Sequence, residues 1–430
     1  MKEKLKFLIL GGGGRESALA WKISLSPRME RLYIAPGNGD ERAEHVDLKL
    51  DNFDSIKEFV DAAGVDLIVV GPEVPLVKGI ADYLKDSGVK VIGPCREGAA
   101  MEGSKEFAKE FMFRHSIPTA RFMTVTSETL QEGYSFLESL NPPYVLKADG
   151  LAAGKGVVIL PDLEEAKDTL AAMLDGMFGK ASETVVIEQY LDGVECSVFV
   201  ATDGEEYKVL PVAKDYKRIG DNDEGPNTGG MGAVSPVVFA DEEFMDKVRR
   251  QIIEPTLNGL RQENIDYRGF LFLGLMNVDG DPYVIEYNVR LGDPETEVVL
   301  PRISSDITDI FEGIADCTLG LKKIETDPRT AATVMLVSKG YPGPYEKGKV
   351  ITGLEKVTDA IVFQAGTKRM PDGTLVTDGG RVLSVTAYGD TTRQAVEKAM
   401  QQASLIEFEG KTLRTDIGRD LERIEAAKGE

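Results

Sequence analysis

The sequence has few of the residues that many enzymes use for nucleophilic or metal chemistry. Its 430 residues include only two histidines and three cysteines. The cysteines stand far apart, at positions 95, 196 and 317, which argues against a zinc site and against a disulfide framework. We therefore expect no histidine-based nucleophilic scheme. Carboxylates, amides, lysines and arginines should carry any chemistry, in a reducing cytoplasm.

Basic charge and long apolar runs are also scarce. With 50 Lys and Arg against 72 Asp and Glu, the net charge is −22, which excludes nucleic acid and anionic membrane surfaces as expected partners. Anionic small molecules remain possible substrates where local clusters of Lys and Arg oppose the net negative charge. No run approaches the roughly 18 apolar residues that a membrane-spanning helix needs, and Phe7–Leu10 is too short for a secretion-signal core.

What is present begins with a glycine-rich stretch, Tyr144–Gly156. Apolar runs on both sides predict two strands joined by a loop of small residues. The backbone N–H groups of its glycines and the charges of Lys147 and Lys155 suit a polyphosphate. The loop is one residue too short for a Walker motif, and Gly156 stands where Ser or Thr should follow. A flexible hairpin tip is the alternative interpretation.

The first hundred residues alternate strand and helix patterns. Strands are predicted at Lys6–Leu10, Leu32–Ala35, Asp66–Val70 and Val89–Ile92, which implies a small parallel sheet. The turn Gly11–Gly14 precedes a helical pattern and forms an anion site by geometry. A dinucleotide site is disfavoured, because the glycine pattern ends on Ser17 and no acidic residue follows the second strand directly.

The middle of the chain offers two further ligand candidates. A helix from Gly103 to His115 carries Lys105 in its first turn, where it can meet an anion. The unit 119–190 closes with the strand Val185–Leu191, whose Glu188 suits either the surface or an adenine-binding edge. The segment Gly225–Gly232 holds four glycines in eight positions. It predicts either a hinge or close backbone approach to a small anionic substrate.

The sharpest pattern is Val284–Leu291. Strict alternation predicts Glu286, Asn288 and Arg290 on one face of a strand. A carboxylate and an amide carbonyl are hard oxygen ligands for Mg²⁺ bridging nucleotide phosphates, and an arginine beside them can stabilise a transferred phosphoryl group. A solvated strand face with a weak Glu–Arg pair is the alternative.

The C-terminal part follows a polar linker, Lys322–Pro328. Its predicted strands and helix are Ala332–Ser338, Ile361–Gln364, Arg381–Ala387 and Thr392–Leu405. They indicate an α+β cap without obvious catalytic residues.

Together these segments resemble the ATP-grasp superfamily and, within it, the phosphoribosylamine–glycine ligase family. The resemblance spans essentially the whole chain and rests on Val69–Leu76, Glu102–Lys105, Lys147–Gly156, Gly225–Gly232, Gly292–Thr296 and Gly379–Val382. It implies a multidomain α/β and α+β fold. The expected parts are a Rossmann-like domain over 1–101, an ATP-grasp domain over 102–322 with a lid at about 120–190, and an α+β domain over 323–430.

The resemblance also implies a reaction. Glycine's carboxylate is phosphorylated by ATP to glycyl phosphate, and the amine of 5-phosphoribosylamine attacks it. The products are glycinamide ribonucleotide, ADP and phosphate, in purine biosynthesis. Because an acyl phosphate hydrolyses readily, a closing lid is expected. The implied partners are these small molecules and Mg²⁺ or Mn²⁺. The enzyme itself is expected to be a monomer in the cytoplasm.

The resemblance assigns site residues as follows. ATP would contact Lys105, Lys147, Gly154, Lys155, Gly156, Glu188, Tyr190, Leu191 and Glu195. The metal would be held by Glu286 and Asn288, and the reacting groups would meet Arg290, Lys155 and Asp215. The substrates would contact Gly13, Arg15, Glu16, Gly71, Pro72, Glu73, Asn227, Thr228, Gly229, Asp293 and Pro294.

Some positions depart from the family pattern. Ser17 and Tyr216 stand where the family usually has histidine, Gly39-Asp40-Glu41 follows Asn38, and Leu291 and Glu297 replace Phe and Gln. Most of these positions are expected on the substrate side. They leave open a different ATP-grasp carboxylate–amine or carboxylate–thiol ligase. A non-catalytic nucleotide-binding protein is the remaining alternative, disfavoured by the full set of phosphoryl-transfer residues.

Overall fold

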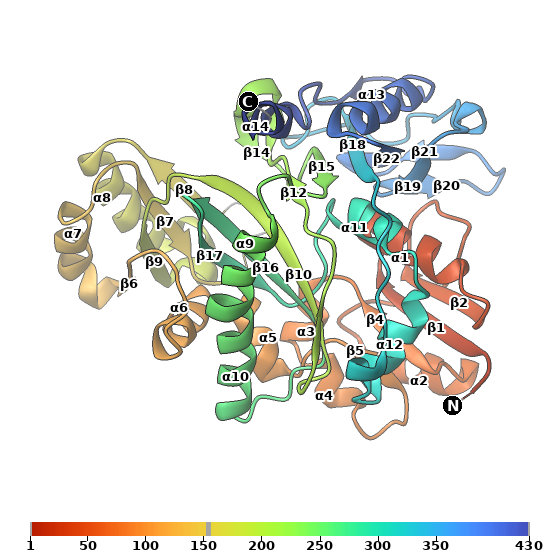
Figure 1. Ribbon diagram of the computed structural model, residues 1–430, viewed down its shortest axis with the longest axis horizontal. Helices are drawn as coiled ribbons and strands as arrows, with labels where there is room; N and C mark the ends of the chain where they lie inside the picture. The colour runs from red at the N-terminus through yellow and green to blue at the C-terminus, as the bar shows by residue number, and fades with distance from the viewer. Residues whose placement is uncertain (1, 152–155, 429–430) are drawn as a thin grey trace.

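A computed structural model of the chain describes residues 2–151 and 156–428. Figure 1 shows the N-terminal α/β region beside a central sheet, a subdomain projecting from the opposite side, and the C-terminal elements above. Within those ranges no helix is both long and apolar enough to cross a membrane.

The N-terminal region is built on a sheet of order β3-β2-β1-β4-β5 whose neighbouring strands all run parallel. The strands are β1 (Leu5–Gly11), β2 (Met29–Pro36), β3 (Glu44–His45), β4 (Leu67–Val70) and β5 (Lys90–Ile92). The helices are α1 (Gly14–Ser24), α2 (Phe53–Ala63), α3 (Glu73–Val77), α4 (Ile80–Leu84) and α5 (Arg96–Gly103). The predicted parallel sheet is confirmed. Because its strands are parallel, the turns after β1, β2 and β4 meet at one edge.

The projecting subdomain is an antiparallel sheet of order β6-β9-β7-β8. Its elements are β6 (Phe122–Thr126), α7 (Leu130–Glu138), β7 (Tyr144–Ala148), β8 (Val157–Leu160), α8 (Leu163–Ala172) and β9 (Thr184–Gln189). Val125, Leu146 and Leu170 form part of a core of its own. The predicted pair of strands around the glycine-rich stretch is confirmed as the β7–β8 hairpin.

The central sheet has the order β11-β10-β16-β17. Its strands are β10 (Val194–Thr202), β11 (Tyr207–Val209), β16 (Gly269–Val278) and β17 (Asp281–Asn288). Its helices are α6 (Lys105–Arg114), α9 (Glu242–Val248), α10 (Glu254–Gln262), α11 (Thr296–Arg302) and α12 (Ile307–Ala315). Val248 of α9 and Leu257 of α10 share a core with Leu273 and Tyr287, which face one side of the sheet. The residues that flank Tyr287 in β17, Glu286 and Asn288, therefore face the other side of the sheet.

Strand β17 differs from the predicted strict alternation. It ends at Asn288, before Arg290, and its register with β16 shifts so that Val284 pairs with Leu275 and Glu286 with Gly274. Ile285 is the extra residue of this bulge, and it does not simply face away from Glu286. A single sequence shows alternation but not the pairing that accommodates an extra residue.

The C-terminal sheet crosses the predicted boundary at 322. Its order is β12-β15-β18-β22-β19, with β23 pairing β18. The strands are β12 (Lys214–Asp215), β15 (Gly232–Ser235), β18 (Thr330–Ser338), β19 (Ile361–Gln364), β22 (Arg381–Gly389) and β23 (Lys411–Thr412). Two hairpins, β13 (Arg218–Gly220) with β14 (Glu224–Asn227) and β20 (Thr367–Arg369) with β21 (Leu375–Thr377), and helices α13 (Thr392–Ala403) and α14 (Arg419–Lys428) complete the region. Strand β12 pairs with β15 and β15 pairs with β18, so these two strands from residues 214–235 belong to the C-terminal sheet.

Candidate active site

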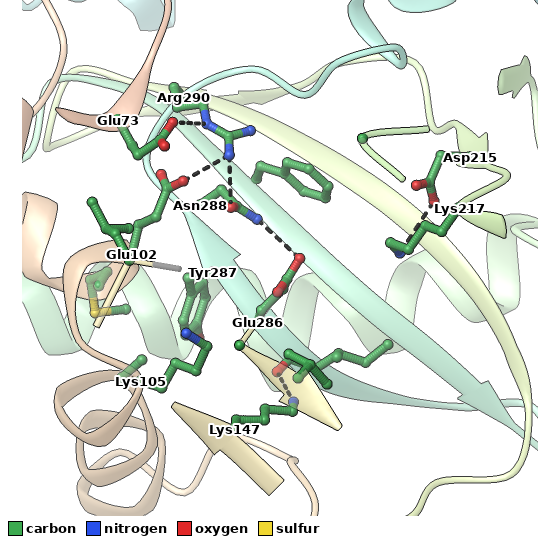
Figure 2. A pocket seen from close by; sticks show the side chains of 18 of the residues that line it. Glu73, Glu102, Lys105, Lys147, Asp215, Lys217, Glu286, Tyr287, Asn288 and Arg290 are labelled. Atoms are coloured by element: carbon green, nitrogen blue, oxygen red, sulfur yellow. Dashed lines mark hydrogen bonds and ion pairs between the residues drawn. The ribbon is translucent and has the colours of Figure 1, made fainter. Parts of the chain in front are cut away.

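A cavity of about 270 Å³ lies between the projecting subdomain and the central sheet. Its wall includes Lys105 and Lys109 of α6, Lys147 of β7, Glu188 of β9, and Glu286 and Asn288 of β17. Residues Asp215, Lys217 and Thr228 close another part of the wall. Figure 2 shows side chains from elements that are distant in sequence directed toward a common space, among them Lys105, Lys147, Lys217, Glu286 and Asn288.

A buried glutamate joins two lysines at the subdomain end. Glu188 is 3% exposed, and its two oxygens each lie 2.9 Å from an ammonium nitrogen, of Lys147 and of Lys109. Burial raises the pKa of Glu188, but the two positive charges outweigh it and hold the pKa below its ordinary value. Burial lowers the pKa of Lys109 to about 8. Glu188 is therefore an internal counter-ion, and the surface interpretation is wrong.

Lys109 is a functional candidate that sequence reasoning missed. It follows Lys105 by four residues, a spacing that places both on one helix face. Lys105 itself lies at the start of α6, with its ammonium 3.4 Å from the carbonyl oxygen of Gly150 and 3.5 Å from that of Asp149. Asp149 also accepts a hydrogen bond from the Glu106 N–H, so a carboxylate already meets this helix N-terminus.

A second network runs along the end of β17 (Figure 2). The Asn288 amide lies 3.5 Å from Glu286 Oε1, and Arg290 donates to Asn288 Oδ1 at 3.1 Å. Arg290 also donates to Glu102 Oε1 at 2.8 Å and lies 3.6 Å from Glu73. Burial raises the pKa of Glu102, against the opposing charge of Arg290. Arg290 is thus held by two acids and is no solvated surface residue.

The donor set at Glu286 fits a divalent cation that shares its coordination with a ligand. Glu286 and Asn288 supply hard oxygen atoms, and the long Asn288 contact leaves the carboxylate largely uncommitted. No group of three or more His, Cys, Asp or Glu side chains suited to a metal occurs among residues 2–151 and 156–428. Mg²⁺ typically takes one or two protein carboxylates and completes its shell with waters and phosphate oxygens. The residues therefore fit Mg²⁺ carried with a nucleotide.

Lys217 links two acids on the far wall. Its ammonium lies 2.5 Å from Glu195 and 3.4 Å from Asp215. The Lys217 charge lowers the pKa of the Glu195 carboxyl. Thr228 follows, with its N–H donating to the Lys217 carbonyl, and the Gly229 carbonyl accepts from Arg381 at 2.6 Å. A hydrogen bond therefore holds the segment Gly225–Gly232 against β22, and the segment is not a free hinge.

The turn between β1 and α1 already binds carboxylates. The Gly13 N–H donates to Glu16 at 2.6 Å, and the Arg15 N–H donates to Asp293 at 3.2 Å. Asp293 also pairs with Arg381 at 2.9 Å, and its pKa is lowered because nearby arginine charges outweigh burial. The predicted anion site therefore exists in geometry, and acidic side chains of the chain itself engage its N–H groups.

The chain matches three family models, described as the phosphoribosylglycinamide synthetase N domain over residues 5–102, ATP-grasp (A) domain over 103–296 and C domain over 331–420. A phosphoribosylamine–glycine ligase of Nostoc sp. is 44% identical over 422 residues, covering 96% of this chain and 99% of the relative. The chain belongs to the phosphoribosylamine–glycine ligase family. The family and fold expected from the sequence are confirmed.

Other members of the family support the same placement. The ligase of Caldanaerobacter subterraneus subsp. tengcongensis is 42% identical over 416 residues, covering 96% of this chain and 99% of the relative. The crystal structure of the Thermotoga maritima ligase superposes with a TM-score of 0.85 at 37% identity, covering 96% of this chain and all of that one. A biotin carboxylase domain of Hydrogenobacter thermophilus, with a TM-score of 0.71 at 17% identity, shares the fold.

The structure brings some of the predicted family residues together. The cavity is lined by Glu73, Lys105, Lys147, Gly156, Glu188, Asp215, Thr228, Gly229, Glu286, Asn288, Arg290 and Asp293. The described residues of its wall do not include Gly13, Arg15, Glu16, Gly71, Pro72, Tyr190, Leu191, Glu195, Asn227 or Pro294. Gly154 and Lys155 lie outside the residues that the structure describes. The roles given to all of them stay predictions.

The positions that depart from the family pattern lie mainly at contacts with C-terminal elements. Ser17 hydrogen-bonds to Asp40, and its hydroxyl accepts from the Gln364 N–H of β19 at 2.9 Å. The Tyr216 hydroxyl donates to Asp420 of α14 at 2.6 Å. Glu297 is fully buried beside Gly14. Among the described residues that line the cavity, none is Ser17, Asp40, Tyr216 or Glu297.

Proposed function

We propose that this protein is a phosphoribosylamine–glycine ligase, an ATP-dependent carbon–nitrogen ligase of purine biosynthesis. Glycine is activated as glycyl phosphate and joined to 5-phosphoribosylamine, giving glycinamide ribonucleotide, ADP and phosphate. The observation that carries the proposal is the convergence of Lys105, Lys147, Glu286, Asn288 and Arg290 on one cavity. Membership of the family over the whole chain supports the substrates, and ATP use follows from the ATP-grasp fold.

The lysines of the cavity suit the nucleotide. Lys105 and Lys147 would contact ATP phosphates, and the lowered pKa of Lys105, caused by burial, would rise again beside a phosphate. Glu188 would hold Lys147 in place through their 2.9 Å pair. Mg²⁺ or Mn²⁺ would be held by Glu286 and Asn288 and would neutralise phosphate charge.

Arg290 would stabilise the phosphoryl group during transfer to glycine. Its guanidinium is fixed by Glu102 and Asn288, so little reorganisation is needed when charge develops. The subdomain of β6 to β9, with its separate core, would close over the cavity and exclude water from the acyl phosphate. We further propose a monomer in the cytoplasm that acts on small molecules, with no nucleic-acid partner.

The test measures ADP release with ATP, Mg²⁺ and glycine, with and without phosphoribosylamine made in situ from ribose 5-phosphate and ammonia. Product mass is read in parallel. Turnover that needs both substrates and yields glycinamide ribonucleotide supports the proposal. ADP release only with another acid–amine pair would mean a different ligase, and ATP binding without turnover would mean a nucleotide-binding protein.

A further inference from the structure

Glu295 is a buried acid of the cavity wall to which the proposed function gives no role. It is 3% exposed and lines the cavity with Asp215, Lys217 and Glu286. Its Oε1 accepts a hydrogen bond of 3.0 Å from the Ser197 hydroxyl. Among the described residues, no lysine or arginine nitrogen lies within 4.0 Å of its carboxylate. It is therefore an acid held in place by a neutral group.

The sheet register places this acid opposite Glu286. Ser197 of β10 pairs with Gly274 of β16, and Gly274 pairs with Glu286 of β17. Directly opposed residues project from the same face, so Ser197 and Glu286 stand about 10 Å apart across two strand spacings. Gly274 between them has no side chain, and the Glu286 side chain packs against this position, since a Cβ at Gly274 would meet Glu286 Cγ at 3.0 Å. Glu286 and Glu295 both line the cavity, so a small acyl group activated near Glu286 would share this space with Glu295.

The charges around Glu295 suit proton exchange near neutral pH. Burial raises its pKa to about 7, and the negative charge of Asp215 adds to the effect, while Lys217 and the Ser197 hydrogen bond oppose it. Glu297 is a further acid that interacts with it. A carboxylate whose pKa lies near the working pH both accepts and releases a proton readily.

We propose that Glu295 accepts the proton that the attacking amine loses when the amide forms. This role rests on the proposed function. The nitrogen lone pair forms the C–N bond to the glycyl carbonyl carbon, and the C–O bond to phosphate breaks with its electron pair leaving on phosphate. The proton passes from nitrogen to a Glu295 oxygen and then to solvent on product release.

The first experiment separates the two halves of the reaction in the Glu295→Gln variant. Glutamine keeps the shape and can still accept from Ser197, but it cannot take the proton. Amide formation with phosphoribosylamine should fall about 100-fold or more. Glycyl phosphate formation, trapped with hydroxylamine as glycine hydroxamate, should stay near the wild-type rate, which also shows that the variant is folded.

The second experiment uses two variants that should move the pH profile in opposite directions. Amide formation should rise with pH as Glu295 ionises. Ser197→Ala removes a hydrogen bond to the charged carboxylate and should move this rise to higher pH. Asp215→Asn removes a neighbouring negative charge and should move it to lower pH.

The outcomes are distinct. Unchanged amide formation in Glu295→Gln, or equal loss of hydroxamate and amide, would overturn the role. So would shifts of the pH profile in the same direction in the other two variants. A wild-type enzyme that makes no glycine hydroxamate would instead refute the proposed function itself.

Discussion

The two ends of the cavity bury charge of opposite sign. The end beneath the projecting subdomain, here called the lysine end, holds Lys105, Lys109, Lys147 and Glu188. The opposite end, here called the acid end, holds Asp293 and Glu295, with Glu297 and Arg381 behind them. Burial lowers the pKa of Lys109 to about 8 and raises that of Glu295 to about 7.

The difference shows what each end is built to receive. A buried charge without a full partner is costly, and a ligand of opposite charge relieves that cost. The lysine end therefore fits a polyphosphate, and the acid end fits an amine or ammonium group. Arg290, held by Glu102 and Asn288, lines the same cavity. The following predictions test this division.

The largest effect is expected from Glu286→Ala. Losing a hard anionic ligand should lower kcat roughly 100-fold or more, because the metal supplies several kcal/mol of charge stabilisation. ADP release at increasing Mg²⁺ measures the effect. Asp281→Ala on the same strand removes only an exposed pair with Lys247 and serves as the control. Near-normal turnover in Glu286→Ala would contradict the metal assignment.

Lys147→Met should weaken the lysine end in two ways. It leaves Glu188 with one buried counter-ion, which should cost about 3–5 kcal/mol of the free energy of unfolding. It should also raise the KM for ATP more than that for glycine. Denaturant titration and initial rates measure these effects. The double variant Lys147→Met/Glu188→Gln also takes the carboxylate away from the buried Lys109, so it should be less stable than Lys147→Met and should not regain ATP affinity. Recovery of ATP affinity would argue against a phosphate contact.

Glu297→Gln should stabilise the acid end in a pH-dependent way. Burial and the neighbouring Asp293 raise the pKa of Glu297 well above its ordinary value. The folded form then holds a proton that the unfolded chain releases above pH 4.5, so this group costs stability as pH rises. The variant should raise the denaturation midpoint more at pH 8 than at pH 5. Glu242→Gln, exposed at the start of α9, should show no such difference.

The smallest effect on catalysis is expected from Ser17→Ala. The hydroxyl bridges Asp40 and the Gln364 N–H, so its loss should cost about 1–3 kcal/mol of stability. Turnover and the KM for phosphoribosylamine should stay near wild type, as measured by the coupled ADP assay. A large change in that KM alone would favour a diverged substrate site.

Local patterns predicted much of this molecule. The glycine turn between β1 and α1, the β7–β8 hairpin and the grouping of Glu286, Asn288 and Arg290 were all readable, because strand alternation and turn chemistry are short-range properties. The bulge at Ile285 could not be predicted from the sequence, since it depends on the pairing of β17 with β16. Lys109 was overlooked although its spacing from Lys105 pointed to it.

The sequence by itself determined the ATP-grasp fold, the family and the residue types of the phosphate and metal contacts. Only the tertiary structure decided which distant groups neutralise them. Glu188 became an internal counter-ion because β9 lies beside β7, and Gly229 is fixed because β22 carries Arg381 to it. Glu295 lines the cavity and accepts a hydrogen bond from Ser197 of β10, a residue distant in sequence. Burial and pairing across the chain set these charges, and neither is a property of neighbouring residues in the sequence.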